Sequence, residues 1–197
     1  MPWYPVKLLS SRLAATNAKG VTEYLLSPVE VDLGSPVVDD ADRIVTTTSM
    51  KNGSYTIAAQ PDVPRNITVT HTAVSTADTL GIITIIVKDR NDDVITEAIT
   101  PLNGTIASGA KAFKTITSVV GSGWVTAAGD DSIVVGVGGL VGLPDKLSLA
   151  RVLWATLGGT REGTLPSFTV SSTVLSQNTI DFNSAWNSSA AKVVYLK

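Results

Sequence analysis

The chain has 197 residues and a formal net charge of −2, and its Lys and Arg residues are scattered, so no nucleic-acid partner is expected, because such partners need clustered basic residues. The sequence contains no cysteine, which excludes disulfides and thiolate metal sites. It is 44% hydrophobic and only 16% charged, against roughly 25% charged in typical soluble domains, yet its longest apolar run is shorter than the ~20 residues of a membrane-spanning helix, so no membrane partner is expected either.

Residues 1–20 are predicted to form an extended N-terminal arm. They begin with prolines and aromatic residues and show no helical or strand periodicity. No basic stretch followed by an apolar block marks a signal peptide. An apolar aromatic arm is costly in water, so we expect it to lie on a neighbouring subunit. The residues predicted to bind a partner are Trp3, Tyr4, Pro5, Leu8 and Leu9.

Residues 21–197 are predicted to form a single β-sandwich domain. Runs rich in Thr, Val and Ile alternate with Gly, Asn, Asp and Pro at short intervals, which is typical of an all-β fold. We therefore expect an antiparallel, jelly-roll-like sandwich. The predicted strands are 23–33, 43–48, 55–59, 66–74, 81–88, 94–100, 111–120, the glycine-rich run within 132–144, 147–157, 167–175 and 192–196.

The clearest hairpin is expected between strands 81–88 and 94–100, and the first of these reads as buried on both faces. The connecting Asp89-x-Asn91-x-Asp93 resembles the start of a calcium loop. The glycine and the glutamate that such a loop requires further along are missing, so a solvated turn is predicted. The acidic runs 39–42 and 130–131 are also expected to be solvated.

The glycine-rich run resembles a nucleotide-binding loop only at first sight. Gly136 and Gly138 satisfy two positions of a dinucleotide loop, but Val141 occupies the third and no amphipathic helix follows. A phosphate loop of the Walker type needs a lysine where Leu143 stands. The run therefore predicts a strand packed so closely against another backbone that a Cβ atom would not fit.

His71 is the only histidine. A Ser-His-Asp site lacks the G-x-S-x-G elbow that would present its serine. His71 alternates with Val69 and Ala73, so it is expected at a core edge or a subunit contact. We therefore predict no catalytic residue, no cofactor and no metal site.

The aromatic residues leave an alternative open, because flat apolar faces can stack on sugars. Core packing and interface anchoring are their commoner uses. The residues that could contribute to a carbohydrate platform are Trp3, Tyr4, Trp124, Trp154, Trp186 and Tyr195.

From Pro64 onward the chain resembles a group of tailed-bacteriophage virion proteins. The likeness covers about the last two-thirds of the chain and consists of strands and turns rather than catalytic residues. The segments that carry it are PRNITVTHTAV, GIITIIVKDRNDDVITEAIT, PLNGT, GAKAFKTITSV, GDDSIVVGVGGLVGLPDKLS and NTIDFNSAWNSSAAKVVYLK.

This resemblance implies a structural component of the particle without enzymatic activity, such as a capsid cement or decoration protein on the capsid surface. The expected partners are the major capsid protein and further copies of the chain, in a homotrimer. A head–tail connector, a tail or head-fibre component, or a carbohydrate-binding module are the alternatives.

Overall fold

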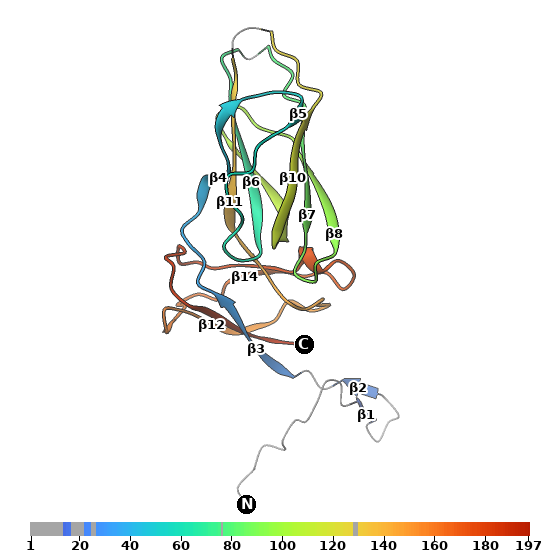
Figure 1. The fold of residues 1–197 in the computed structure, drawn as a ribbon. Coiled ribbons are helices and arrows are strands. Elements are labelled where there is room, and N and C mark those ends of the chain that lie inside the picture. Colours follow the sequence, from blue (N-terminus) through green and yellow to red (C-terminus); the bar gives the residue numbers. More distant parts are fainter. Residues whose placement is uncertain (1–13, 17–21, 25–26, 76, 128–129) are drawn as a thin grey trace, which may run out of the picture.

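The computed structural model describes residues 14–16, 22–24, 27–75, 77–127 and 130–197, and β-strands dominate these residues (Figure 1). The described part contains one short 3-10 helix, η1 (Leu175–Gln177). The β-branched and apolar runs form strands because their side chains pack well on a pleated surface. The predicted all-β sandwich is confirmed.

Eight consecutive strands form the larger part of the molecule, a sandwich of two sheets. Their orders are β4-β11-β6-β9 and β5-β10-β7-β8, and all pairs are antiparallel. Counted one to eight along the chain, this is 1-8-3-6 against 2-7-4-5, the strand order of a jelly roll. The strands are β4 (Asp40–Ser49), β5 (Gly53–Ser54), β6 (Arg65–Thr72), β7 (Ile82–Lys88), β8 (Val94–Ile99), β9 (Ile106–Phe113), β10 (Thr115–Ser122) and β11 (Ser132–Gly142).

The core between these two sheets is built from alternate residues of each strand. In β7, Ile83, Ile85 and Val87 are fully buried in it, whereas Ile82 is 43% exposed. The prediction that this strand is buried on both faces is therefore wrong. Only one sheet covers it, so one face packs on the core and the other is partly solvated.

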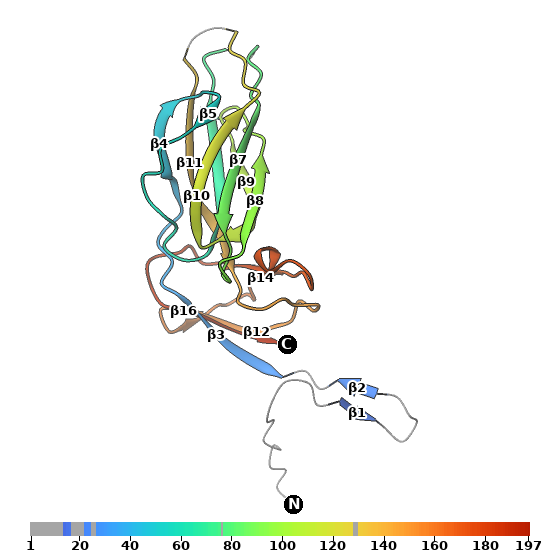
Figure 2. The same cartoon turned by 45° about the vertical axis from the view of Figure 1, so that its right-hand side comes forward.

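A second, smaller layer lies below the jelly roll, and we call it the base (Figures 1 and 2). One sheet has the order β13-β12-β16-β3, and it shares a hydrophobic core with the lower end of β11 and with the β14–β15 pair, which extends the β11 sheet. The strands of the base are β3 (Pro28–Gly34), β12 (Val152–Leu157), β13 (Thr160–Arg161), β14 (Ser167–Thr169), β15 (Thr179–Asp181) and β16 (Ala191–Leu196).

Strand β11 joins the two cores. Its residue Val137 belongs to the jelly-roll core and Val141 to the base core.

Near the N-terminus, β1 (Ala14–Thr16) pairs antiparallel with β2 (Thr22–Tyr24). The two strands lie on either side of residue 20, where the arm is predicted to end. The division into an arm and a single domain stays a prediction.

Several predicted strand limits change. Residues 55–59 do not form the predicted strand, because they bridge the two sheets. Ala58 N–H donates to Ile44 O (2.8 Å) on β4, and Tyr55 N–H donates to Val119 O (2.9 Å) on β10. The predicted strand 111–120 is divided at Lys114 between two sheets, and only Ser167–Thr169 of 167–175 forms a strand. For segment 147–157 the sequence leaves a short helix after Pro144-Asp145 as the alternative to a strand, and the structure forms a strand there, β12.

Candidate functional site

The predicted partner-binding residues, Trp3, Tyr4, Pro5, Leu8 and Leu9, lie outside the described residues. The candidate functional side chains that the structure does describe lie in two places. One is the tip, the end of the jelly roll formed by the loops after β4, β6, β8 and β10. The other is the junction between the jelly roll and the base.

His71 and Asp131 form a buried pair at the tip. Both side chains are fully buried, and His71 Nε2 lies 2.7 Å from Asp131 Oδ2. Asp131 Oδ1 also accepts the N–H of Val74 (2.8 Å), in the loop that follows β6. Asp78 in the same loop accepts the N–H of Ala127 from the loop after β10. The two acids therefore fasten two tip loops to each other, and the prediction of a solvated Asp131 is wrong.

The electrostatics of this pair are those of a structural contact. Burial alone would raise the pKa of Asp131, but hydrogen bonds from Val74 N–H and His71, with Asp78 close by, outweigh burial and hold it below its usual value. Among the residues that the structure describes, none forms a hydrogen bond with the buried His71 Nδ1, so no described hydroxyl is bonded there as a nucleophile would be. His71 therefore lies at a core edge, one of the two positions that the sequence predicts.

We expect Asp131→Asn to lower the free energy of unfolding by about 1–3 kcal/mol at neutral pH, because His71 loses its buried charged partner. The lowered pKa makes the contribution of Asp131 complete above its ordinary value of 3.8 and lost as the pH falls below that. Urea unfolding from pH 6 to 2 should therefore show a shallower acid decline for the variant. The adjacent exposed Asp130→Asn is the matched control, and equal declines in wild type and Asp131→Asn would contradict this role.

Arg65 is the central residue of the junction and is fully buried at the start of β6. Its Nε donates to Gly138 O (2.9 Å) on β11, and its Nη1 to Val37 O (2.8 Å) and Asp62 Oδ1 (3.3 Å). Its Nη2 donates to Asp39. One guanidinium thus connects β11 with the segments before β4 and before β6, at the level where the two cores meet.

The acids around Arg65 are held as part of the structure. Burial raises the pKa of Asp39, Arg65 opposes this rise, and the carboxylate of Asp181 adds to it. Asp62 also accepts the N–H of Val37 (2.7 Å). Asp39 was predicted to be a solvated acid; half of its side chain remains exposed, but it pairs with Arg65.

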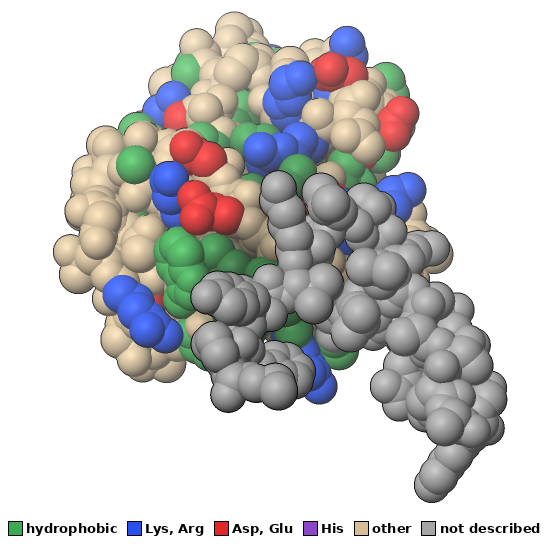
Figure 3. All heavy atoms as spheres, turned by 90° about the horizontal axis from the view of Figure 1, so that it is seen from below, with side chains coloured by type: hydrophobic (Ala, Val, Ile, Leu, Met, Phe, Trp, Pro, Cys, Tyr) green, Lys and Arg blue, Asp and Glu red, His purple; other side chains and the backbone are tan. Residues whose placement is uncertain are grey.

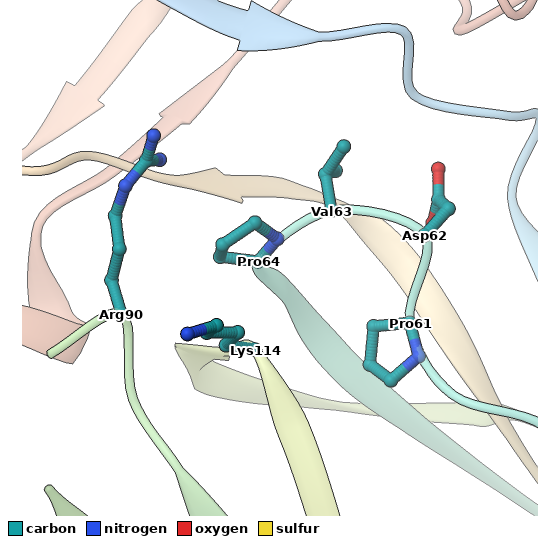
Figure 4. A pocket seen from close by; sticks show the side chains of 6 residues that line it. All are labelled: Pro61, Asp62, Val63, Pro64, Arg90 and Lys114. Carbon is teal, nitrogen blue, oxygen red and sulfur yellow. The ribbon is translucent and has the colours of Figure 1, made fainter. Parts of the chain in front are cut away.

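A hollow of about 400 Å³ lies beside this junction (Figure 4). Its polar groups are already engaged: Arg90 Nη1 donates to Gly142 O (3.2 Å), and Lys114 Nζ lies 3.0 Å from Asp92 Oδ1. The hollow therefore offers no cluster of free polar groups for a ligand. Its lining residues are Pro61, Asp62, Val63, Pro64, Arg90 and Lys114.

The glycine-rich run serves packing, as predicted. A Cβ on Gly136 would lie 2.1 Å from Asp40 O of β4, and one on Gly138 would lie 2.8 Å from the side chain of Asn66. Gly139 is less crowded, with Asp181 Oδ1 at 3.3 Å. The close approach of two backbones is thus strongest at Gly136.

In the turn after β7, the side chain of Asp89 does not lie in solvent as predicted. Asp89 is buried, and its Oδ1 accepts the N–H groups of Asn91 (2.8 Å) and Asp93 (3.2 Å). Its carboxylate therefore organises the turn instead of facing solvent. Among the described residues, no group of three or more His, Cys, Asp or Glu is placed to hold a metal ion.

The tip also carries a set of exposed aliphatic side chains. They lie in the loops or at the strand ends of the tip, and their exposed fractions run from 43% to 66%. They are Val74, Ile82, Leu102, Ile106 and Val125.

The outer surface of the base carries charged and apolar side chains together (Figure 3). Alternation along β3 and β16 directs Glu30, Asp32 and Lys192 away from the base core. Lys192 Nζ lies 3.1 Å from Glu30 Oε1, and this hydrogen bond raises the pKa of Lys192.

The structure separates the aromatic residues proposed as a sugar platform. Trp186 and Tyr195 are buried in the base core, where Trp186 Nε1 donates to Gly139 O (2.9 Å). Trp124, at the tip, packs against the jelly-roll core. These three side chains therefore do not form a common exposed face.

Sequence reasoning missed Arg65. The signal for it was present, because Arg65 has the same strand parity as Ile67, Val69 and His71 and therefore had to face the core. A charged residue in that register predicts a buried ion pair.

Comparison of the chain with protein-family models, with curated proteins and with solved structures gives no match. Among the described residues, no helix is long and apolar enough to cross a membrane.

Proposed function

We propose that this chain is a non-enzymatic structural protein of a tailed-bacteriophage particle, a cement or decoration protein on the capsid surface. In this role it binds the assembled lattice of the major capsid protein as a homotrimer. The observation that carries the proposal is the jelly-roll strand order in a chain whose sequence resembles virion proteins. Jelly rolls recur in viral capsid proteins and in lectins, and the buried aromatic residues favour the first of these roles over the second.

The use of the buried charged groups also supports a structural role. Arg65 and the His71–Asp131 pair are the strongest candidates for chemistry in the described residues, and both fasten loops or connect the two cores. A protein that must persist in a particle benefits from such contacts, because the absence of cysteine leaves packing, hydrogen bonds and association as its sources of stability.

The mechanism is thermodynamic. A protein that binds only the assembled lattice stabilises it by mass action, since disassembly must also release the bound copies. The exposed aliphatic residues of the tip and the apolar N-terminal arm provide contact surfaces. Obligate interfaces of this kind bury roughly 2,000 Å² or more.

We expect the double substitution Trp3→Ala, Tyr4→Ala to weaken binding to purified capsid shells at least about tenfold, because buried aromatic anchors dominate interface energies. Occupancy is measured by co-sedimentation with shells that lack the chain. The melting temperature of the free variant should match wild type, which separates lost binding from lost folding. Undiminished occupancy would remove the arm from the mechanism.

A further inference from the structure

In the described structure, the edge strand β3 of the base sheet is left open over its whole length. The edges of β8 and β9 are closed by charged side chains: Glu97 accepts the N–H of Ala110 (2.9 Å), and Lys111 Nζ donates to Thr96 O (2.8 Å). This arrangement blocks the addition of a further strand to that side of the jelly roll.

The opposite side of the jelly roll is closed by the extended segment 55–60. Gln60 makes two hydrogen bonds with the backbone of Ile116 on β10, of 2.7 and 3.1 Å. Together with the bonds from Ala58 to β4 and from Tyr55 to β10, they occupy backbone groups on both sheet edges. Both sides of the sandwich are therefore protected.

No described residue covers strand β3 in this way. Of the described strands it pairs only with β16, and Ser27 and Lys197 exchange two backbone hydrogen bonds at its start. Alternation from this pair directs the N–H and C=O groups of Glu30 and Asp32 away from β16. In the part of the chain that the structure describes, no hydrogen bond reaches those outward backbone groups.

An open edge of this kind binds an extended backbone, and its side chains specify which one. Along β3, Val29, Val31 and Leu33 face the base core, whereas Glu30 and Asp32 face outward. Two copies of β3 cannot pair well, because their acids would lie opposite each other. A suitable strand has apolar residues on the inner face and a basic residue between them.

We infer that the strand that completes the base sheet is the N-terminal segment Pro5–Leu9 of a second copy of the chain. Its sequence Val6-Lys7-Leu8 offers apolar residues on one face and a lysine on the other. With Lys7 opposite Asp32, Val6 and Leu8 extend the inner apolar face. This inference rests on the proposed function, in which the arm is a contact surface that lies on a neighbouring subunit, and it gives the arm a binding site there.

The register of β1 with β2 argues for a second copy. Ala14 lies opposite Tyr24, so the same ladder continued within one chain would place Leu8 opposite Glu30 and Val6 opposite Asp32. Opposite residues share a face, which would bring Lys7 to the core side and the aliphatic residues to the acids. A segment from a second copy is free of that register.

The absence of native cysteine allows a direct test by disulfide trapping. Lys7→Cys and Asp32→Cys chains of different tag length are mixed in mild oxidant, and opposite residues on paired strands lie within disulfide range. We expect a mixed cross-linked dimer at least about ten times more abundant than with Arg161→Cys, an exposed position on β13 at the other edge of the same sheet. Equal yields for the two positions would overturn the inference.

The double variant Lys7→Cys, Asp32→Cys separates the two possible sources of the strand. Interchain products support a second copy, and a purely intrachain disulfide contradicts it. As a check without cysteine, the amides of Glu30 and Asp32 in the wild-type chain should exchange with deuterium much more slowly than unpaired amides. If trapping fails while the protein still binds capsid shells, only this receptor is wrong; if shell binding is also absent, the proposed function fails.

Discussion

Arg65→Met is expected to lower the free energy of unfolding by about 3–5 kcal/mol, the cost of breaking a buried ion pair by removing one partner. The methionine fills much of the volume but cannot donate a hydrogen bond. The carbonyls of Val37 and Gly138 and the carboxylate of Asp62 would then remain without their donor where two cores meet. Chemical denaturation at neutral pH measures the change.

The matched control is Arg161→Met, an exposed arginine on β13, which should change stability by no more than about 0.5 kcal/mol. Arg65→Lys should lie between the two, because an ammonium keeps the charge but lacks the planar fork of donors. A loss below about 1 kcal/mol for Arg65→Met, the ordinary cost of an average substitution, would contradict the central role of this residue.

Gly136→Ala is expected to destabilise the protein by about 3 kcal/mol, at the upper end for overpacking. The added methyl group would lie 2.1 Å from the carbonyl oxygen of Asp40, and a backbone atom cannot move aside as the end of a side chain can. Strands β4 and β11 would have to separate at this point. Thermal unfolding and the yield of folded protein measure the effect.

Two glycines provide controls for this substitution. Gly163→Ala adds a methyl group with nothing within 4 Å and should be near neutral. Gly139→Ala, with its nearest neighbour at 3.3 Å, should be intermediate. If the melting temperature of Gly136→Ala equals that of the wild type, the close backbone approach inferred from the glycine-rich run is wrong.

The sequence predicts the class of fold because strand periodicity and turn residues are local signals. The hairpin 81–100, the strand before Gly158-Gly159 and the close packing of the glycine-rich run all follow from such signals, and the structure confirms them. The jelly-roll order also agrees with the prediction, although sandwich topology depends on contacts between strands far apart in the chain.

Buried polar contacts were less accessible to sequence reasoning. Asp131 and Asp89 are in loop-like sequence, where acids are usually solvated, yet both are buried. Asp131 accepts a backbone N–H of a neighbouring loop, and Asp89 accepts one within its own turn. The partners of Arg65 lie at residues 37, 39, 62 and 138, and only the folded chain brings them together. Residues 55–59 read as a strand, but they connect two sheet edges.

The central claim is that this chain is a structural protein bound to an assembled capsid. Quantitative mass spectrometry of purified particles, with the major capsid protein as internal standard, tests it most directly. The account predicts a fixed ratio on the scale of the shell subunits, and particles without the chain should come apart at a lower temperature. A copy number that corresponds to a single ring of subunits per particle would indicate a connector. Absence of the chain from the particles would contradict the account.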